Sequence, residues 1–233
     1  MELESRFPSP SLFPNGSGLS RLLGAWADEH LFRPGAALSM STNADIPEIV
    51  LNDRRAFFTF LDFDQLHDQT PQFYGQFAAQ LHALESVLDS GSDYLLGDTP
   101  SWADVLAYFP LWMARGNIAL IDDLLSELDA TRGWELRMQA IGHGKRRDLD
   151  DAQALSVAAR SKPTASSQVL NVWPKGLAPG DEVAVTPLDY GATPVHGTLL
   201  RHTHEEISIL RDSALVGEVA VHFPKIGYDI RGI

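Results

Sequence analysis

The chain has 233 residues, of which 44% are hydrophobic and 21% are charged, and its formal net charge is −13. The length accommodates one large domain or two small ones, and the composition is that of an ordinary soluble globular protein. The excess of acids argues against partners such as nucleic acid or an anionic membrane, which need a basic surface. The chain has no cysteine, which excludes disulfides, thiolate metal ligands and a cysteine nucleophile. Because a signal peptide and a long apolar run are both missing, we expect a cytoplasmic protein.

The first sixteen residues predict an extended linker over 1–16, because four of them are Pro or Gly: Pro8, Pro10, Pro14 and Gly16. A helical domain is predicted to follow over residues 17–160. Its first helix covers 17–40, where apolar residues recur at the spacing of one helix face. Trp26 and Phe32 in this helix could line a pocket, but aromatic residues at helical spacing usually bury, so core packing is the favoured interpretation.

Two further helices are predicted over residues 44–60 and 71–89, with an acidic turn over 61–70 between them. The turn lacks the ligand spacing and the glycine of a calcium-binding loop, so we predict no metal there. Pro71 stands at the first position of the second helix, where its missing N–H costs nothing.

The stretch from Gly91 to Asn117, GSDYLLGDTPSWADVLAYFPLWMARGN, organises the predicted helical domain. Ser101 and Asp104 have the spacing of a capping box, in which each side chain accepts a hydrogen bond from the other residue's backbone N–H. They form a structural N-cap. The residues that follow leave almost no polar face, which predicts a central helix buried all round.

The string Y-L-L-G-D-T-P-S-W-A-D-V-L-A-Y-F-P resembles the core segment of the C-terminal helical domain of glutathione S-transferases. In that family a Leu-Gly-Asp loop leads into a Ser/Thr-x-Ala-Asp capping box on the central helix. The residues that match are Leu96, Gly97, Asp98, Ser101, Ala103, Asp104 and Ala107. In the family these residues serve folding rather than catalysis.

The resemblance extends to the N-terminus, where Leu3-Glu4, Arg6-Phe7-Pro8 and Leu12-Phe13-Pro14 are similar to the end of the family's thioredoxin-like first domain and the linker after it. It implies that residues 1–16 are a remnant of that domain and that the glutathione site and catalytic residue lie outside this sequence. The pair Glu4-Ser5 does not take the role of the family's glutathione-binding Glu-Ser pair, which stands further upstream.

After the central helix, shorter helices are predicted over 118–128 and 129–142, and an amphipathic helix over 148–160. Residues 161–176 are rich in Ser, Thr and Pro and predict a linker. From residue 177 the helical spacing gives way to short β-type runs separated by Gly, Pro and Asp turns. The runs predict a small β-barrel domain over 177–233, with strands at 182–186, 195–203, 206–210, 218–223 and 228–230.

The pair His202-x-His204 would place both imidazoles on one face of a strand, with Glu206 on the same face, as a candidate metal site. A third ligand at suitable spacing does not follow, and histidines on exposed strands are common, so we predict no metal. No nucleotide-binding or nucleophile-elbow motif occurs in the sequence.

The predicted fold class is α+β multidomain: an all-α glutathione transferase C-terminal-like helical bundle followed by a small all-β barrel. The resemblance implies that the helical domain forms the hydrophobic co-substrate side of a pocket. The candidate lining residues are Trp26, Phe32, Tyr108, Trp112 and Arg115. No residue receives a catalytic role, and glutathione enters as a cofactor only if the missing domain is supplied.

Whether the chain is an enzyme therefore stays open at this level. A chain without the thiol-binding domain is expected to be inactive alone. The alternative is a non-catalytic protein-interaction or scaffold module. The partners implied by these two functions are a second copy of the chain or another protein, and a hydrophobic small molecule.

Overall fold

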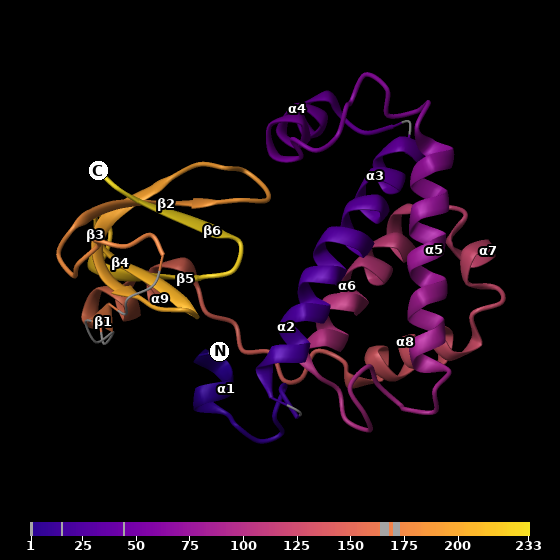
Figure 1. Ribbon diagram of the computed structural model, residues 1–233, viewed down its shortest axis with the longest axis horizontal. Helices are drawn as coiled ribbons and strands as arrows, with labels where there is room; N and C mark the ends of the chain where they lie inside the picture. Colours follow the sequence, from indigo (N-terminus) through magenta and orange to yellow (C-terminus); the bar gives the residue numbers. More distant parts are fainter. Residues whose placement is uncertain (1, 15, 44, 164–167, 170–172) are drawn as a thin grey trace. The chain divides into compact units, whose positions relative to one another are not determined.

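The computed structural model describes residues 2–14, 16–43, 45–163, 168–169 and 173–233. The chain divides into two compact units, Met1–Leu51 with Phe60–Lys145 and Asn52–Thr59 with Arg146–Ile233. The first unit is helical and the second contains a β-sheet (Figure 1). No helix among the described residues is both long enough and apolar enough to span a membrane.

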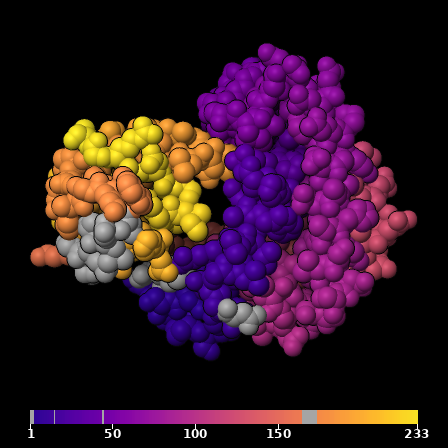
Figure 2. Space-filling view, in the orientation of Figure 1, coloured from indigo at the N-terminus to yellow at the C-terminus, as the bar shows by residue number. Residues whose placement is uncertain are grey.

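The helical unit is a bundle in which α3 and α5 lie side by side, as the adjoining indigo and magenta surfaces in Figure 2 show. Its core is formed by buried side chains from most of its helices, with Phe77 of α5 and Trp134 of α8 among the largest. The helical segments are α1 (Glu2–Arg6), α2 (Ser17–Trp26), the π-helix η1 (Ala27–Phe32), α3 (Arg33–Thr42), α4 (Glu48–Phe57), α5 (Thr70–Leu88), α6 (Trp102–Asn117), α7 (Ile121–Leu125) and α8 (Asp129–Ile141). Residues 52–57, at the end of α4, cluster with the second unit.

Residues 2–6 form α1, which corrects the prediction of an extended linker over 1–16. The run Glu-Leu-Glu-Ser-Arg contains good helix formers, and the three prolines that suggested an extended segment all come after it. The helix ends ahead of Pro8, because a proline disfavours helical dihedrals at the residue before it.

Hydrogen bonds join the segment after α1 to α1 itself and to the start of α6. The Glu4 carboxylate accepts hydrogen bonds from the Ser11 hydroxyl (2.5 Å) and the Leu12 N–H (3.0 Å). The Leu12 carbonyl in turn accepts the N–H of Trp102 (2.8 Å) at the start of α6. These bonds hold the predicted linker against the entrance of the central helix.

The helix predicted over 17–40 extends to Thr42 and contains the π-helical segment η1 in its middle. Pro34 stands two residues after the end of η1. A proline has no N–H to donate and crowds the carbonyl four residues earlier, here that of His30. The wider π turn lies where this conflict arises. The apolar spacing could not predict it, because a six-residue segment does not distinguish a π turn from an α turn.

The start of α6 is the capping box that the sequence predicted. The Asp104 carboxylate accepts the Ser101 N–H (2.8 Å) and the Ser101 hydroxyl (2.6 Å), and the Ser101 oxygen accepts the Asp104 N–H (3.4 Å). Asp104 also accepts the N–H of Leu95 (2.9 Å) and the indole N–H of Trp134 (2.8 Å). One buried carboxylate thus joins the Gly-Asp loop, α6 and α8.

Helix α8 begins without a cap from its own sequence, because Leu128 precedes it. The missing cap comes from α5. The two oxygens of Glu85 accept the N–H groups of Ala130 (3.0 Å) and Thr131 (2.7 Å). Partial burial pulls the pKa of Glu85 upward, but the hydrogen bonds from Thr131 and Ala130 outweigh it and lower the pKa below its usual value.

We expect Glu85→Ala to lower the unfolding free energy of the helical unit by about 1–2 kcal/mol, since two N–H groups at a helix start lose a charged acceptor. Chemical denaturation followed by far-UV circular dichroism measures the change. Glu127→Ala, at an exposed site, is the matched control and should change it by less than about 0.5 kcal/mol. Equal midpoints for Glu85→Ala and the control would contradict the cross-helix cap.

The second unit contains α9 (Asp151–Arg160) and a six-stranded sheet. Five strands pair antiparallel in the order β5-β4-β3-β2-β6, and β1 pairs parallel with β3. Their core is formed by inward-facing side chains: Val183, Val185, Leu199, Ile207, Ile209, Phe223 and Ile230. The strands are β1 (Gln168–Val169), β2 (Glu182–Pro187), β3 (Val195–His202), β4 (Glu206–Ser213), β5 (Gly217–Pro224) and β6 (Tyr228–Gly232).

The predicted barrel is not closed. A barrel requires its first and last strands to be hydrogen-bonded to each other. In the described part of the chain, β5 pairs only with β4 and β6 only with β2. The prediction located all five antiparallel strands but could not establish closure, because the strand pattern in the sequence does not report which edges meet.

Two segments predicted to lie outside the barrel domain cluster with the sheet. Helix α9 was predicted to end the helical domain, yet it belongs to the second unit. Within the predicted linker 161–176, Gln168 and Val169 pair with Arg201 and His202 of β3. Residues 164–167 and 170–172 of that linker lie outside the described residues.

Candidate functional site

One side of α6 carries large apolar side chains that are exposed. Trp102 and Val105 are each 37% exposed, Phe109 is 48% exposed and Trp112 is 60% exposed. Their spacing of three, four and three residues places them on one face of the helix. The sequence predicted a helix buried all round, so this face is where the structure departs from the prediction.

An aromatic ring from the preceding helices completes this face. Phe32, the last residue of η1, stacks on Phe109 with ring centroids 5.6 Å apart and an interplanar angle of 24°. Phe109 stacks in turn on Trp112, with centroids 6.4 Å apart. We call Phe32, Trp102, Val105, Phe109 and Trp112 the aromatic face.

The close approach of α2 to α6 depends on Gly24. A Cβ atom at this position would lie 2.6 Å from the Leu106 side chain, which is well inside van der Waals contact. With hydrogen in its place, α2 and the π turn after it can lie against α6. This contact brings Phe32 within stacking distance of Phe109.

Tyr108 and Arg115 point away from the aromatic face, toward α8. The Tyr108 ring meets the Trp134 ring edge-on, with centroids 6.1 Å apart. Partial burial raises the pKa of the Tyr108 phenol, the negative charge of Glu135 raises it further, and a hydrogen bond with Gln139 opposes them. The phenol therefore stays protonated at neutral pH and is a poor proton acceptor.

Arg115 makes a two-pronged ion pair with a buried carboxylate. Its Nε and Nη2 donate to the two oxygens of Glu135 at 2.8 and 2.7 Å, and its third nitrogen pairs with Asp122. The hydrogen bond to Glu135 raises the pKa of the Arg115 guanidinium, against the effect of its partial burial. Glu135 is 3% exposed, so its charge is compensated by Arg115 rather than by water.

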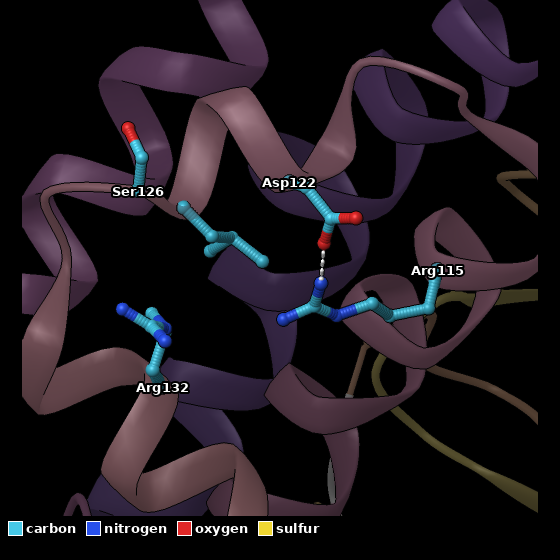
Figure 3. A pocket seen from close by; sticks show the side chains of 5 residues that line it. Arg115, Asp122, Ser126 and Arg132 are labelled. Carbon is cyan, nitrogen blue, oxygen red and sulfur yellow. Dashed lines mark hydrogen bonds and ion pairs between the residues drawn. The ribbon is translucent and has the colours of Figure 1, made fainter.

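Arg115 also lines a hollow of about 360 Å³ together with Asp122, Leu125, Ser126 and Arg132. Figure 3 shows the Arg115–Asp122 pair on one side of the hollow and Ser126 and Arg132 on the other. Arg132 pairs with the exposed Asp129 at 3.4 Å. Since both arginines already have carboxylate partners, the hollow offers no uncompensated charge that would select a charged ligand.

The structure thus separates the five pocket candidates into three places. Phe32 and Trp112 lie on the aromatic face, and Tyr108 and Arg115 lie against α8. Trp26 packs on the core and donates its indole N–H to Gln80 of α5 (2.9 Å). Sequence reasoning missed Phe109, which joins Phe32 to Trp112; its signal was its position three residues before Trp112 and four after Val105.

The candidate metal pair of the sheet does not share a face. Strand β3 ends at His202, whose side chain is fully buried, whereas His204 lies beyond the strand and is exposed. Within the described ranges, no group of three His, Asp or Glu side chains is placed to hold a metal ion.

Part of the helical unit matches a known protein family. The family model described as "Glutathione S-transferase, C-terminal domain" matches residues 59–119, which contain α5 and α6. A solved structure described as a GST-like protein from Pseudomonas syringae aligns with 100% of this chain and 75% of its own, at 28% sequence identity and a TM-score of 0.77. A search of curated proteins found no match.

A second solved structure, the beta-etherase LigF from Sphingobium sp. strain SYK-6, aligns with 60% of this chain and 66% of its own, at 17% identity. Its TM-score of 0.43 is too low to support an argument.

The fold of the first unit is that of a helical domain built round a capped central helix, which is the class that the family model describes. Through residues 59–119 the helical unit is similar to the C-terminal domain of glutathione S-transferases.

Proposed function

We propose that the chain is the co-substrate half of a glutathione S-transferase-like protein, in which the aromatic face forms the hydrophobic wall of the pocket. The observation that carries the proposal is the stacked, exposed set Phe32, Phe109 and Trp112 on the central helix. Exposed aromatic rings in an apolar setting favour flat hydrophobic ligands, because stacking adds to the free energy of burial.

The location of the face supports this function. An apolar patch of this kind on a soluble protein marks a surface that another molecule covers. In the glutathione S-transferase family the pocket lies between the helical domain and a thiol-binding domain. A wall supplied by α6 and η1 would meet the co-substrate from the helical side, with Trp112 as its most exposed ring.

Conjugation also needs the thiol bound, oriented and partly ionised next to the electrophile. The groups near the aromatic face that could serve are committed elsewhere: Tyr108 is a protonated phenol facing α8, and Arg115 is paired with Glu135. The part of the chain that the structure describes would then hold one reactant only, which gives no proximity advantage. We therefore expect this chain to need a thiol-binding domain, in the same polypeptide or from a partner.

A protein-interaction module is the second candidate, and the same face favours it, since an exposed apolar patch also suits a protein contact with another domain or a second copy of the chain. The two functions differ in small-molecule binding. A co-substrate wall binds an aromatic compound at Phe109 and Trp112, whereas a protein contact has no need to.

We expect purified residues 1–233 to conjugate glutathione to an aryl chloride at the uncatalysed rate. The measurement is the initial rate of conjugate formation, with a fully active glutathione S-transferase as the positive control and buffer as the blank. Turnover well above the blank that is lost in Tyr108→Phe would overturn the proposal and restore the chain as an enzyme in its own right.

A further inference from the structure

His202 is a fully buried histidine in the core of the sheet unit, and neither of its ring nitrogens has a hydrogen-bond partner among the described residues. Its cross-strand neighbours on the same face are apolar: Ile207 stands opposite it on β4, and Phe223 stands opposite Ile207 on β5. Buried polar groups are almost always bonded, so an unbonded imidazole calls for an explanation.

The groups around His202 disfavour its charged form. Lys225 approaches from the turn between β5 and β6, and His204 from the turn between β3 and β4. Burial, followed by the positive charges of Lys225 and His204, lowers the pKa of His202. Burial lowers the pKa of Lys225 as well, and Asp229 of β6 partly offsets it.

The nearest carboxylate on β4 is on the other side of the sheet. Glu206 is two residues from Ser208 on the face opposite His202, where it bonds His222 (2.5 Å) and pairs with Arg201 (3.5 Å). Asp229 is bonded to Arg231 (2.7 Å). On β1, the residue that pairs with His202 is Val169, which carries no charge.

We propose that His202 is a built-in acid switch of the sheet unit, in which protonation of its ring under mildly acidic conditions opens the β3–β4–β5 end of the sheet. The closed sheet accommodates only the neutral ring, because an imidazolium there would lie among apolar side chains beside Lys225. The open sheet lets the ring take up a proton from water.

The direction of the pH effect follows from the lowered pKa of His202. In the open state the ring binds a proton at about pH 6.5 and below. In the closed state the ring binds a proton only at lower pH. The neutral ring therefore stabilises the closed sheet fully above about pH 6.5, and this stabilisation is lost as the pH falls through the lowered pKa of His202. One proton changes the opening constant by up to about tenfold per pH unit in that window.

Hydrogen exchange with mass spectrometry on the full chain at pH 7.5, 6.5 and 5.5, corrected for intrinsic exchange rates, tests the switch. We expect protection of peptides covering β3 to β5 to fall by up to about tenfold from pH 6.5 to 5.5. In His202→Phe, which fills the site with an apolar ring, this fall should disappear. His196→Gln, an exposed histidine on the same strand, is the matched control and should keep it.

Equal pH dependence in His202→Phe and in the unchanged chain would overturn the proposal, as would protection of β3 to β5 that does not vary with pH. A second measurement needs no variant. In ¹⁵N-histidine spectra of the folded chain, the His202 ring should take up its proton below the ordinary imidazole value of about pH 6.5 while the amides of the sheet remain protected. A ring that takes up its proton near pH 6.5 in an intact sheet contradicts the switch.

Discussion

Asp104→Ala is expected to lower the unfolding free energy of the helical unit by about 3–5 kcal/mol, since it removes the acceptor of several buried donors at once. Asp104 is fully buried, and its carboxylate accepts hydrogen bonds from the Ser101 N–H, the Ser101 hydroxyl, the Leu95 N–H and the Trp134 indole. Removing it leaves these donors without an acceptor in a site that water does not reach.

Denaturant unfolding, with tryptophan fluorescence and circular dichroism as probes, measures this effect. Ser101→Ala should cost less, about 1–2 kcal/mol, because Asp104 keeps its bonds to Leu95 and Trp134. Asp98→Ala, an exposed aspartate in the preceding loop, is the matched control and should cost less than about 0.5 kcal/mol. A value for Asp104→Ala close to that of Asp98→Ala would show that the buried carboxylate does not hold the loop, α6 and α8 together.

Arg115→Met is expected to be the other severe change, with a loss of about 3–5 kcal/mol, because it leaves the buried carboxylate of Glu135 without its cation. The arginine side chain is 31% exposed, whereas that of Glu135 is 4% exposed. The cost therefore arises mainly from the stranded carboxylate and only in small part from the solvated pair with Asp122.

The double variant Arg115→Met/Glu135→Leu separates these contributions. Because replacing both members of a buried ion pair by apolar residues is often close to neutral, the double variant should be more stable than Arg115→Met alone. Arg132→Met, which breaks only an exposed pair with Asp129, should cost less than about 1 kcal/mol. A double variant less stable than Arg115→Met would contradict the stranded charge as the cause.

Local sequence signals predicted much of this fold. The capping box at Ser101 and Asp104 is read from two residues three apart, and its bonds are present. The alternating runs beyond residue 177 located the five antiparallel strands, because side-chain alternation and turn residues are both properties of short segments. The helix that opens the bundle was likewise predicted from its spacing.

Features that depend on distant residues were not predictable in the same way. Glu85 caps a helix that begins 44 residues later in the chain, at Asp129. The aromatic face depends on the stacking of Phe32 on Phe109, which the close contact of α2 with α6 at Gly24 allows. It also depends on the exposure of Trp112, which the rest of the bundle leaves partly uncovered. The spacing in α6 shows that its residues are apolar on every side, but not which side the rest of the bundle covers.

The burial of His202 was missed for a related reason. An alternating strand pattern gives two faces, and the sequence alone interpreted His202 and His204 as a pair on the exposed one. The strand ends at His202, whose face is fixed by its register with Ile207 and Phe223. The pairing of β3 with β4, and of β4 with β5, sets this register. The spacing of the two histidines gives no information about that pairing.

We propose that the aromatic face binds a hydrophobic co-substrate, while the described residues offer no site for the thiol. Titration calorimetry of the purified chain with glutathione and, separately, with a dinitrobenzene tests it most directly. We predict no binding heat with glutathione, and binding of the aromatic compound that weakens at least about tenfold in Phe109→Ser/Trp112→Ser, a loss of about 1.4 kcal/mol. One-to-one binding of glutathione, or aromatic binding that the double variant leaves unchanged, would contradict the claim.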